Sequence, residues 1–270
     1  MPERRPRLEG KVAIVTGAGS SGPGIGTGKA ISVLFAREGA RVLLVDRVAT
    51  HAEETLAAIR EEGGDASVFE ADVIIPADCQ EMVETARARY GRLDILVNNV
   101  GIRGPGSVVD VKEEDWNRVL DVNLKSMMLT SKYAIPAMIE GGGGAIVNLS
   151  SIAGLRAGSG GANLPYAVSK GGGIALTTEM AVQHGRDHIR VNGIAPGHLY
   201  TPMVAAGMTE EMRDLRRRAG PLGTEGTAWD IAWAAVFLAS DEARWITGVV
   251  LPVDAGLLAT TPLAMLRHMR

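Results

Sequence analysis

The sequence is poor in cysteine, in aromatic residues and in long apolar runs. One cysteine, Cys79, stands among 270 residues, so no disulfide can form within the chain and a reducing compartment is expected. Aromatic residues make up 4%, so the core must consist mainly of Val, Ile, Leu, Ala and Met. The longest plain apolar run, Ile231 to Ala239, is too short to span a bilayer, and no apolar signal segment follows the charged start. A soluble cytoplasmic protein is expected.

The sequence also lacks an excess of positive charge. Its 28 basic and 31 acidic residues give a net charge of −3, which leaves no basic footprint for nucleic acid. Apolar residues make up 46% and charged residues 22%, which excludes a disordered chain. Glycine is abundant, with 34 residues, but it follows no Gly-X-Y period. The glycines therefore serve turns and close packing.

Short β-branched segments alternate with helix-length amphipathic segments, such as 50–62 and 77–90, along the chain. Strands that are apolar throughout are typical of a sheet covered on both faces, and the alternation indicates parallel crossovers. We predict one domain over residues 1–270: an α/β, doubly wound, mostly parallel, seven-stranded sheet of the Rossmann type. The expected strands are Val12–Val15, Val42–Val45, Ala66–Phe69, Ile95–Val97, Ala145–Leu149, Val191–Ile194 and Val249–Val253.

The segment from about 199 to 226 interrupts this alternation. It contains a helix-like piece, 209–219, with Pro202 before it and Gly220 after it. A segment outside the core pattern that is bounded by turn-forming residues is a candidate for a small lid. The alternative is an ordinary surface excursion.

A glycine-rich turn, Thr16 to Gly26, follows the first expected strand and precedes a helix. Glycines in this place let backbone amides approach a pyrophosphate, and the helix N-terminus adds its dipole. Asp46 ends the second strand 20 residues after Gly26, where a carboxylate binds the 2′-hydroxyl of the NAD ribose. Arg47 offers a partner for the 2′-phosphate of NADP instead, but Asp46 would repel that phosphate. The sequence therefore favours NAD, with a capping or surface role as the alternative for Asp46.

Four further motifs occur in order after the glycine turn. They are Asn98–Gly101, Ser150–Gly154, Tyr166–Lys170 and Pro196–Gly197, each after an expected strand or on a helix. With these motifs the chain resembles the short-chain dehydrogenase/reductase family in its single-domain, NAD(P)-dependent form. The resemblance extends from Leu8 to the end of the last strand. A Tyr-x-x-x-Lys pair alone is weak evidence, whereas five motifs in this order are specific.

The resemblance implies four catalytic residues. Tyr166 and Lys170 lie one helical turn apart, so the ammonium, together with the positive nicotinamide, is expected to lower the pKa of the phenol toward the operating pH. Lys170 would also hold the ribose hydroxyls of the nicotinamide half. Ser151, rather than Ser150, would hydrogen-bond the substrate oxygen, because it directly precedes the matching Ile-Ala-Gly. Asn123 would hold a water in the proton relay; capping or kinking a helix is its structural alternative.

The resemblance also implies which residues bind the coenzyme, although this chain departs from the family pattern at three places, of which Val100 in place of the usual alanine is a small change. The glycine turn is longer than usual and contains Pro23, so which glycines touch phosphate stays open. Ile74 and Ile75 follow the expected adenine contacts, which predicts a more apolar adenine pocket. The expected coenzyme-binding residues are Gly17, Gly24, Ile25, Gly26, Asp46, Asp72, Val73, Asn99, Gly101, Tyr166, Lys170, Pro196, Gly197 and Thr201.

Three other features carry weaker expectations. His184 and His188 are four residues apart, but no carboxylate or cysteine joins them at a suitable spacing, so no metal site is expected. His198 follows the sixth strand and is a candidate for the substrate pocket. The run 171–173 of three glycines disfavours a helix, which a closely packed second helix would explain. The resemblance implies that this helix pairs across a dimer interface within a tetramer.

The expected activity is hydride transfer between NAD(H) and a secondary alcohol or the matching ketone. Two alternatives stay open: a 3-oxoacyl thioester reductase, against which Asp46 speaks because such enzymes favour NADPH, and a regulatory dinucleotide-binding protein without catalysis. A neutral, largely apolar substrate is expected, unless Arg103 or Arg156 turns inward and pairs with a carboxylate. The residues expected to line the cleft are Ile102, Ile152, Ala153, Leu155, Leu164, His198, Leu199, Tyr200, Met203 and Met208.

Overall fold

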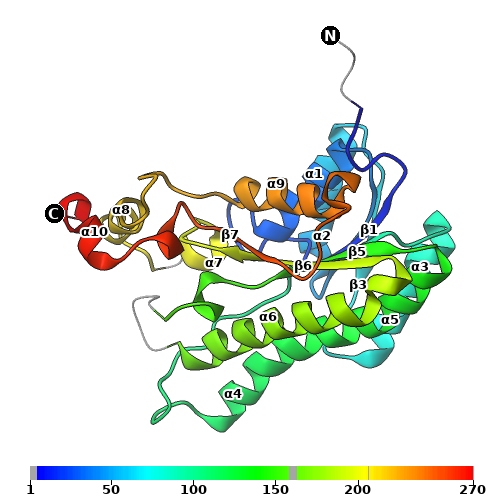
Figure 1. Ribbon diagram of the computed structural model, residues 1–270. Helices are drawn as coiled ribbons and strands as arrows, with labels where there is room; N and C mark the ends of the chain where they lie inside the picture. Colours follow the sequence, from blue (N-terminus) through cyan, green and yellow to red (C-terminus); the bar gives the residue numbers. More distant parts are fainter. Residues whose placement is uncertain (1–4, 158–162, 206, 270) are drawn as a thin grey trace.

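A sheet of seven parallel strands forms the middle layer of the protein (Figure 1). The computed structural model describes residues 5–157, 163–205 and 207–269. The strand order is β3-β2-β1-β4-β5-β6-β7. Strands β2 and β3 are added on one side of β1 and strands β4 to β7 on the other, so the strand order reverses between the neighbouring strands β1 and β4. The predicted seven-stranded fold is confirmed. The strands are β1 Val12–Thr16, β2 Arg41–Asp46, β3 Ala66–Glu70, β4 Ile95–Asn98, β5 Gly144–Leu149, β6 Ile189–Pro196 and β7 Val250–Val253.

Helices cover both faces of the sheet (Figure 1). One face carries α1 (Thr27–Arg37), α2 (Ala49–Glu61) and α9 (Ala228–Ala239). The other carries α3 (Pro76–Tyr90), α5 (Ser126–Glu140) and α6 (Leu164–His184). Outside these layers lie α4 (Glu113–Leu120), α7 (Pro202–Ala205), α8 (Glu210–Ala219) and α10 (Pro262–Met269).

Each face of the sheet has its own apolar core. Aliphatic side chains dominate both, as the low aromatic content requires, and Phe35 on α1 is a fully buried exception. Burying each such side chain contributes about 1.5–3 kcal/mol. Cys79 on α3 lies in the second core, where burial raises the pKa of its thiol to about 11. Within the described part of the chain, no helix combines the length and apolar character needed to cross a membrane.

A buried polar network ties α5 and α6 to the middle of the sheet. The Asn98 amide at the end of β4 donates to Asn148 Oδ1 on β5 over 2.9 Å and to Ser131 Oγ over 3.2 Å. Asn98 Oδ1 accepts from the Thr130 hydroxyl, and Asn148 donates to Thr177 of α6. Buried polar groups are stable only when satisfied, so this network fixes both helices against the strands that precede the candidate active site.

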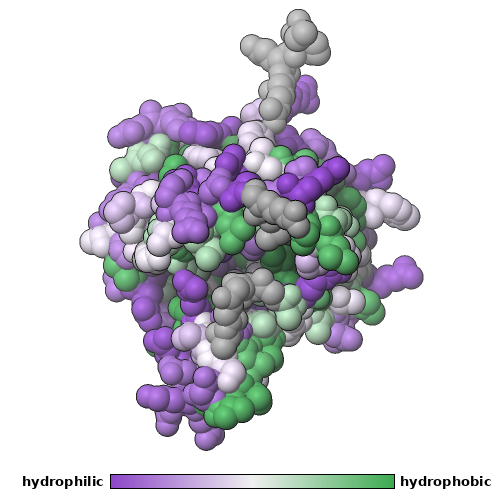
Figure 2. All heavy atoms as spheres, turned by 90° about the vertical axis from the view of Figure 1, so that its left-hand side faces the viewer, coloured by the Kyte–Doolittle hydropathy of each residue, from purple (hydrophilic) through white to green (hydrophobic). Residues whose placement is uncertain are grey.

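The expected lid contains two helices, α7 and α8. Thr209 caps α8, because its hydroxyl accepts a hydrogen bond of 3.2 Å from the Met212 amide. Arg213 connects α8 to the end of the segment through two 2.6 Å hydrogen bonds to Glu225, and its guanidinium lies 3.9 Å from the centre of the Tyr200 ring. Figure 1 shows α8 at the left, beside α10, and α7 nearer to the sheet. Figure 2, which faces this side of the molecule, shows a hollow with apolar side chains inside it.

Candidate active site

A cavity of about 510 Å³ lies at the carboxyl ends of β1, β2 and β4, where the strand order reverses. Ligands bind at this point in open α/β sheets. The expected coenzyme-binding residues that line the cavity are Gly17, Gly26, Asp46, Asp72, Val73, Asn99, Gly101 and Thr201. The expected residues that do not line it are Gly24, Ile25, Tyr166, Lys170, Pro196 and Gly197.

The glycine-rich turn is shaped so that α1 approaches β1 closely. Gly17 has a φ of +62°, a left-handed conformation that favours glycine. A Cβ on Gly28, in the first turn of α1, would lie 1.9 Å from the Gly17 carbonyl oxygen, so no other residue fits there. Sequence reasoning missed Gly28, although the third glycine of a dinucleotide-binding turn serves this close packing. Such a turn fits the pyrophosphate of a dinucleotide.

The added length of the turn carries Gly24 and Ile25 away from the cavity. Gly24 has a φ of +106°, and a Cβ there would meet Pro202 of α7 at 3.6 Å. Ile25 is 38% exposed. At the start of α1, the Gly26 amide donates to Ser20 Oγ over 2.8 Å. The turn residues that line the cavity are Gly17, Gly19, Ser20, Ser21 and Gly26, whereas Gly22 and Gly24 lie beside Pro202 of the lid segment.

The Asp46 carboxylate is fixed at the end of β2. Its Oδ2 accepts from the Gly19 amide and its Oδ1 from the Val48 amide, each over 3.0 Å. Each carboxylate oxygen keeps a further lone pair for a ribose hydroxyl. The Arg47 side chain is 74% exposed, with Nη1 3.9 Å from Asp72 Oδ2. This carboxylate, as a hydrogen-bond acceptor, fits a dinucleotide whose adenosine ribose has free hydroxyls to donate.

The expected apolar adenine pocket has an apolar wall on one side. Val73 and Ile74 line the cavity beside Asp72, whereas Ile75 is 45% exposed at the start of α3. The Asp72 backbone amide donates to Asp78 Oδ2 over 2.8 Å, which holds this turn in place.

Tyr166 and Lys170 project from the first turns of α6 beside the end of β5. Lys170 is 3% exposed, and its ammonium donates to the Leu149 carbonyl over 2.7 Å. Its nitrogen lies 5.7 Å from the centre of the Tyr166 ring. Ser151 lies close enough to Tyr166 for its hydroxyl to lower the pKa of the phenol, whereas the Ser150 hydroxyl donates to the Lys170 carbonyl over 2.8 Å. The two serines therefore have different roles. Ser150 holds α6 in place, and Ser151 faces the phenol.

The pKa of Tyr166 differs in direction from the sequence expectation. The sequence predicts that Lys170 lowers it, but desolvation of the phenol raises it above its ordinary value. The lowering contributions come from the Ser151 hydrogen bond and from the charge of Arg103. Burial also lowers the pKa of Lys170 to about 8. The phenol is thus a proton donor at neutral pH, and Ser151 and Arg103 favour its ionised form.

Asn123 lies in a π-helical turn, Asp121–Lys125, between α4 and α5. Its side chain is fully buried, accepts from the Ile102 amide over 2.7 Å and donates to the Ile102 carbonyl over 2.9 Å. It also donates to the Ser169 hydroxyl, which in turn donates to the Tyr166 carbonyl over 2.7 Å. π-Turns are frequent at functional sites. Here the turn connects the loop after β4 to the helix that carries Tyr166.

The three glycines after Lys170 are explained by close packing within the chain. A Cβ on Gly172 would lie 2.7 Å from Leu124, and one on Gly173 would lie 3.3 Å from Met127 Sδ. The second helix expected from the sequence is thus the π-turn and α5 of the same chain. Gly154 performs the same task on the other side, because a Cβ there would lie 2.6 Å from the Lys170 carbonyl carbon.

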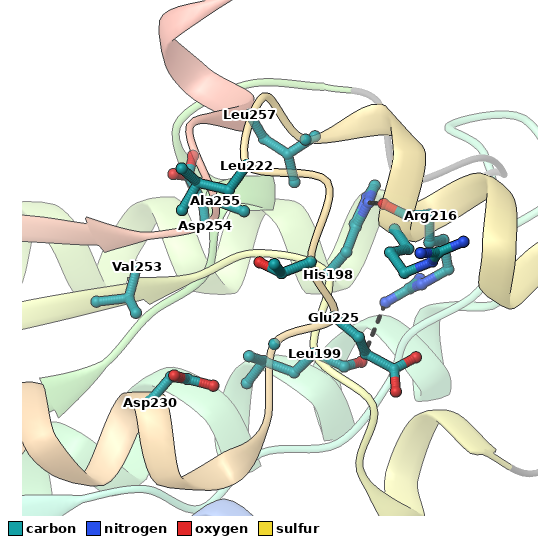
Figure 3. Close-up of a pocket in the computed structure, with 14 residues that line it drawn as sticks. His198, Leu199, Arg216, Leu222, Glu225, Asp230, Val253, Asp254, Ala255 and Leu257 are labelled. Carbon is teal, nitrogen blue, oxygen red and sulfur yellow. Dashed lines mark hydrogen bonds between the residues drawn. The ribbon is translucent and has the colours of Figure 1, made fainter. Parts of the chain in front are cut away.

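His198 lies in a second, smaller cavity of about 150 Å³ between β6, α8 and β7 (Figure 3). Its Nδ1 is 3.3 Å from the Arg216 carbonyl oxygen, and burial lowers the pKa of its imidazole. Leu222 and Asp254 lie on the far side of this cavity. His198 therefore does not line the dinucleotide cavity.

The side chains expected to form a substrate cleft are divided between different places. Ile102 and Met203 line the dinucleotide cavity, while His198 and Leu199 line the smaller one. Tyr200 is covered on one face by the guanidinium of Arg213. Other expected members lie elsewhere: Ile152 and Ala153 in the short turn after β5, Leu164 at the start of α6, Leu155 exposed at 45%, and Met208 just before α8.

Arg103 and Arg156, the two arginines that could pair with a charged substrate, lie in different places. Arg156 is exposed and donates to the Thr260 carbonyl over 3.4 Å. Arg103 is close enough to Tyr166 for its charge to lower the pKa of the phenol.

In the parts of the chain that the structure describes, no three His, Cys, Asp or Glu residues are grouped as metal ligands are. His184 Nδ1 lies 3.0 Å from Asp187 Oδ2.

Comparisons with known proteins agree with this geometry. A family model described as enoyl-(acyl carrier protein) reductase matches residues 22–258. The chain is 38% identical over 252 residues to 3-oxoacyl-[acyl-carrier-protein] reductase of Thermotoga maritima, covering 93% of this chain and 99% of that protein. It is 37% identical over 250 residues to 2,5-dichloro-2,5-cyclohexadiene-1,4-diol dehydrogenase of Sphingobium indicum, covering 93% and 97%. A Burkholderia xenovorans structure, provisionally assigned as a short-chain dehydrogenase/reductase, aligns with a TM-score of 0.90 and 44% identity over 94% of this chain and 99% of that one.

Proposed function

Because the chain belongs to the short-chain dehydrogenase/reductase family, and is an oxidoreductase that binds a nicotinamide dinucleotide, we propose that it interconverts a secondary alcohol and the matching ketone with NAD(H). The dinucleotide, when bound, supplies or accepts the hydride. Gly17, Gly28 and Asp46 would hold its adenosine and phosphate half. The residues of the chain bind, orient and protonate the substrate.

One observation carries this proposal: the buried Lys170 ammonium lies 5.7 Å from the centre of the Tyr166 ring, and Ser151 lowers the pKa of the Tyr166 phenol. In the reductive direction, Ser151 orients the carbonyl and Tyr166 donates the proton to its oxygen. The raised pKa keeps the phenol protonated at neutral pH, ready to donate. In the oxidative direction, the phenolate takes the hydroxyl proton, and Lys170 and Arg103 supply the neighbouring positive charge.

The coenzyme is proposed to be NAD rather than NADP. The support is the fixed Asp46 carboxylate, which accepts from a 2′-hydroxyl and repels a 2′-phosphate. The Arg47 side chain is 74% exposed and reaches into solvent. It therefore does not neutralise the Asp46 carboxylate, which repels a 2′-phosphate.

A 3-oxoacyl thioester reductase is the second candidate. It is favoured by the 38% identity to the Thermotoga maritima 3-oxoacyl-[acyl-carrier-protein] reductase. Asp46 argues against it through the coenzyme, because such reductases normally use NADPH. A regulatory protein without catalysis is disfavoured, because Asn123, Ser151, Tyr166 and Lys170 are all in place.

We also propose that the protein is cytoplasmic and forms a homo-oligomer.

The test is a panel run in both directions with NAD(H) and NADP(H). The panel contains a cyclic or aryl ketone, a sugar, a keto acid and a 3-oxoacyl thioester, with kcat/KM measured for each. Turnover of a ketone with NADH supports the proposal. Best turnover of the thioester with NADPH replaces it with the second candidate, and tight NADH binding without any turnover supports the regulatory alternative.

A further inference from the structure

The lid segment forms one wall of the dinucleotide cavity. Thr201, at its start, and Pro202 and Met203, on α7, line the cavity. Helix α7 has four residues, and a helix this short is not stable by itself. This lid wall, residues 201–203, is therefore held in place by the chain segments around it.

The lid wall is connected to the sheet through a narrow base. This lid base consists of residues 198–200, which follow β6, and residues 224–226, which lead back to α9. Leu199 and Gly226 form an isolated bridge there, and the Tyr200 amide donates to the Gly226 carbonyl over 2.9 Å. Tyr200 is 37% exposed, so burial alone does not fix its side chain. Since Tyr200 directly precedes Thr201, its position determines where the lid wall begins.

Arg213 of α8 contacts both chains of the lid base. Its guanidinium donates two hydrogen bonds of 2.6 Å to the Glu225 carboxylate and lies 3.9 Å from the centre of the Tyr200 ring. A bidentate pair fixes the orientation of the guanidinium, and a cation over an aromatic ring is attracted by its π-electrons. One side chain therefore holds the residue before the lid wall to the chain that returns from the lid segment.

Arg216, three residues further along α8, adds a second connection to the lid base. Its Nη2 donates to the Leu199 carbonyl over 3.3 Å, beside Glu225 in Figure 3. Helix α8 is thus attached to the lid base at several points. None of Arg213, Glu225 and Tyr200 lines the dinucleotide cavity, so their effect on a bound dinucleotide must pass through the lid wall.

The order of the strands indicates which half of a dinucleotide meets the lid wall. Asp46 ends β2, the lid wall follows β6, and β1, β4 and β5 lie between these two strands. A dinucleotide whose adenosine ribose is bound by Asp46 would extend along the carboxyl ends of the strands toward β6. Its nicotinamide half would therefore lie against the lid wall, and its adenosine half would lie away from α8.

Building on the proposed function, we propose that Arg213 is a positioning residue for the coenzyme. By holding Tyr200 against Glu225, it keeps the lid wall against the nicotinamide half of the bound dinucleotide. Arg213 acts through these two residues, since it does not line the cavity itself. The affinity for the whole dinucleotide then depends on a helix outside the binding site.

Calorimetry with NADH and with ADP tests this inference. ADP contains the adenosine half with both phosphates and lacks the nicotinamide half. Arg213→Gln is expected to weaken NADH affinity by about three- to tenfold, the combined value of an exposed cation–π contact and an exposed ion pair. ADP affinity is expected to stay unchanged, which also shows that the variant is folded. Unchanged NADH affinity, or an equal loss for ADP, overturns the proposal.

Matched variants locate the effect in the lid base. Glu225→Gln is expected to weaken NADH affinity in the same way as Arg213→Gln. Glu210→Gln is the control, because Glu210 also pairs with Arg213, at 3.5 Å, but lies at the start of α8 with its side chain 83% exposed. Equal losses in Glu210→Gln and Glu225→Gln mean that the charges around α8, rather than the lid base, affect binding, and overturn the proposal.

The aromatic contact has its own pair of variants. Tyr200→Leu is expected to weaken NADH affinity, because the guanidinium loses the π-face over which it lies. The conservative Tyr200→Phe keeps that face and is expected to restore the affinity. Wild-type affinity in Tyr200→Leu overturns the proposal.

These binding measurements separate the inference from the proposed function, because they need no turnover. If no ketone is reduced with NADH, but Arg213→Gln weakens NADH binding and leaves ADP binding unchanged, the positioning role stands and the proposed reaction fails. If ketones are reduced and Arg213→Gln binds NADH as the wild type does, the proposed reaction stands and the positioning role fails.

Discussion

Tyr166 has one chemical duty in this site that phenylalanine cannot perform. Tyr166→Phe removes the proton-transfer group and keeps the ring in place. We expect kcat to fall by about 10²–10⁴-fold, the usual value of general acid–base catalysis, with NADH affinity nearly unchanged. Steady-state kinetics and a fluorescence titration of NADH measure the two effects. A variant that keeps more than about a tenth of the wild-type kcat shows that another group transfers the proton.

Asp46 is expected to set the coenzyme preference. NAD should be preferred over NADP in the wild type, and Asp46→Ala or the closer-sized Asp46→Asn should reduce the preference by about tenfold, because the repulsion of the 2′-phosphate is lost. Glu70→Ala is the control, since Glu70 ends the neighbouring strand beside Asp46 but does not line the cavity. The measurement is the ratio of kcat/KM for the two coenzymes. A wild-type ratio of one contradicts the assignment.

Lys170 links the stability of the coenzyme-free protein to pH. Burial lowers the pKa of its ammonium to about 8, so below that pH the charged form destabilises the fold. As pH rises from about 8 toward 10.5, the folded state releases its proton before the unfolded state does, and the free energy of unfolding rises. Lys170→Met lacks this contribution.

The difference in free energy of unfolding between wild type and Lys170→Met should therefore shift in favour of the wild type between pH 7.5 and 10, by on the order of 2 kcal/mol. Urea denaturation at several pH values measures it. The exposed Lys112→Met should show no such shift. A difference that is flat with pH would mean that burial does not lower the pKa of Lys170 in the folded protein.

Among the elements, the junction of the glycine-rich turn with α1 tolerates the least change. In Gly28→Ala the new methyl group would collide with the Gly17 carbonyl, so the helix must move away from β1. We expect a loss of about 1–3 kcal/mol in stability and a weaker affinity for NADH. Gly185→Ala is the control, because Gly185 has a φ of −61° and open space around it, and should be neutral or stabilising by about 0.4–1 kcal/mol.

The strand ends, the glycine-rich turn and the π-turn differ in how far the sequence predicts them. Parallel β/α alternation determines which loops meet, so the amino-acid pattern alone predicts that the ends of β1, β2 and β4 lie together. The path of the lengthened glycine turn could not be predicted, because its course depends on a contact between Gly24 and Pro202. The π-turn around Asn123 leaves no periodic signal, since it adds one residue to a helix that is otherwise regular.

The pKa of Tyr166 and the charges around it were the features of the site that the sequence predicted least well. A Tyr-x-x-x-Lys spacing indicates that the two groups are neighbours, and it led to the expectation of a lowered tyrosine pKa. Desolvation of the phenol raises that pKa instead, and the Lys170 ammonium is hydrogen-bonded to the Leu149 carbonyl. Likewise, the charge of Arg103 near the phenol depends on the backbone path after β4, which no residue pattern determines.

At the scale of the whole molecule, large apolar side chains stay exposed at separate places. Trp245 is 92% exposed, Val182 78%, and Leu251 on the edge strand β7 36%. Apolar surface and an open strand edge favour association. We expect a dimer or tetramer of the 28.4 kDa chain by light scattering after size exclusion. Leu251→Lys should lower the measured mass if β7 takes part, and a wild-type monomer at micromolar concentration contradicts the expectation.

The burial of Cys79 has a practical consequence for experiments on this protein. Its thiol is fully buried, donates to the Val73 carbonyl over 3.3 Å and has a pKa of about 11, so maleimides should leave the native chain unlabelled. A cysteine introduced on the surface would then carry a fluorophore at one defined site without prior removal of a native thiol. Met212, 48% exposed on α8, is a suitable position. A dye there would report on movement of the lid segment when coenzyme or substrate is added.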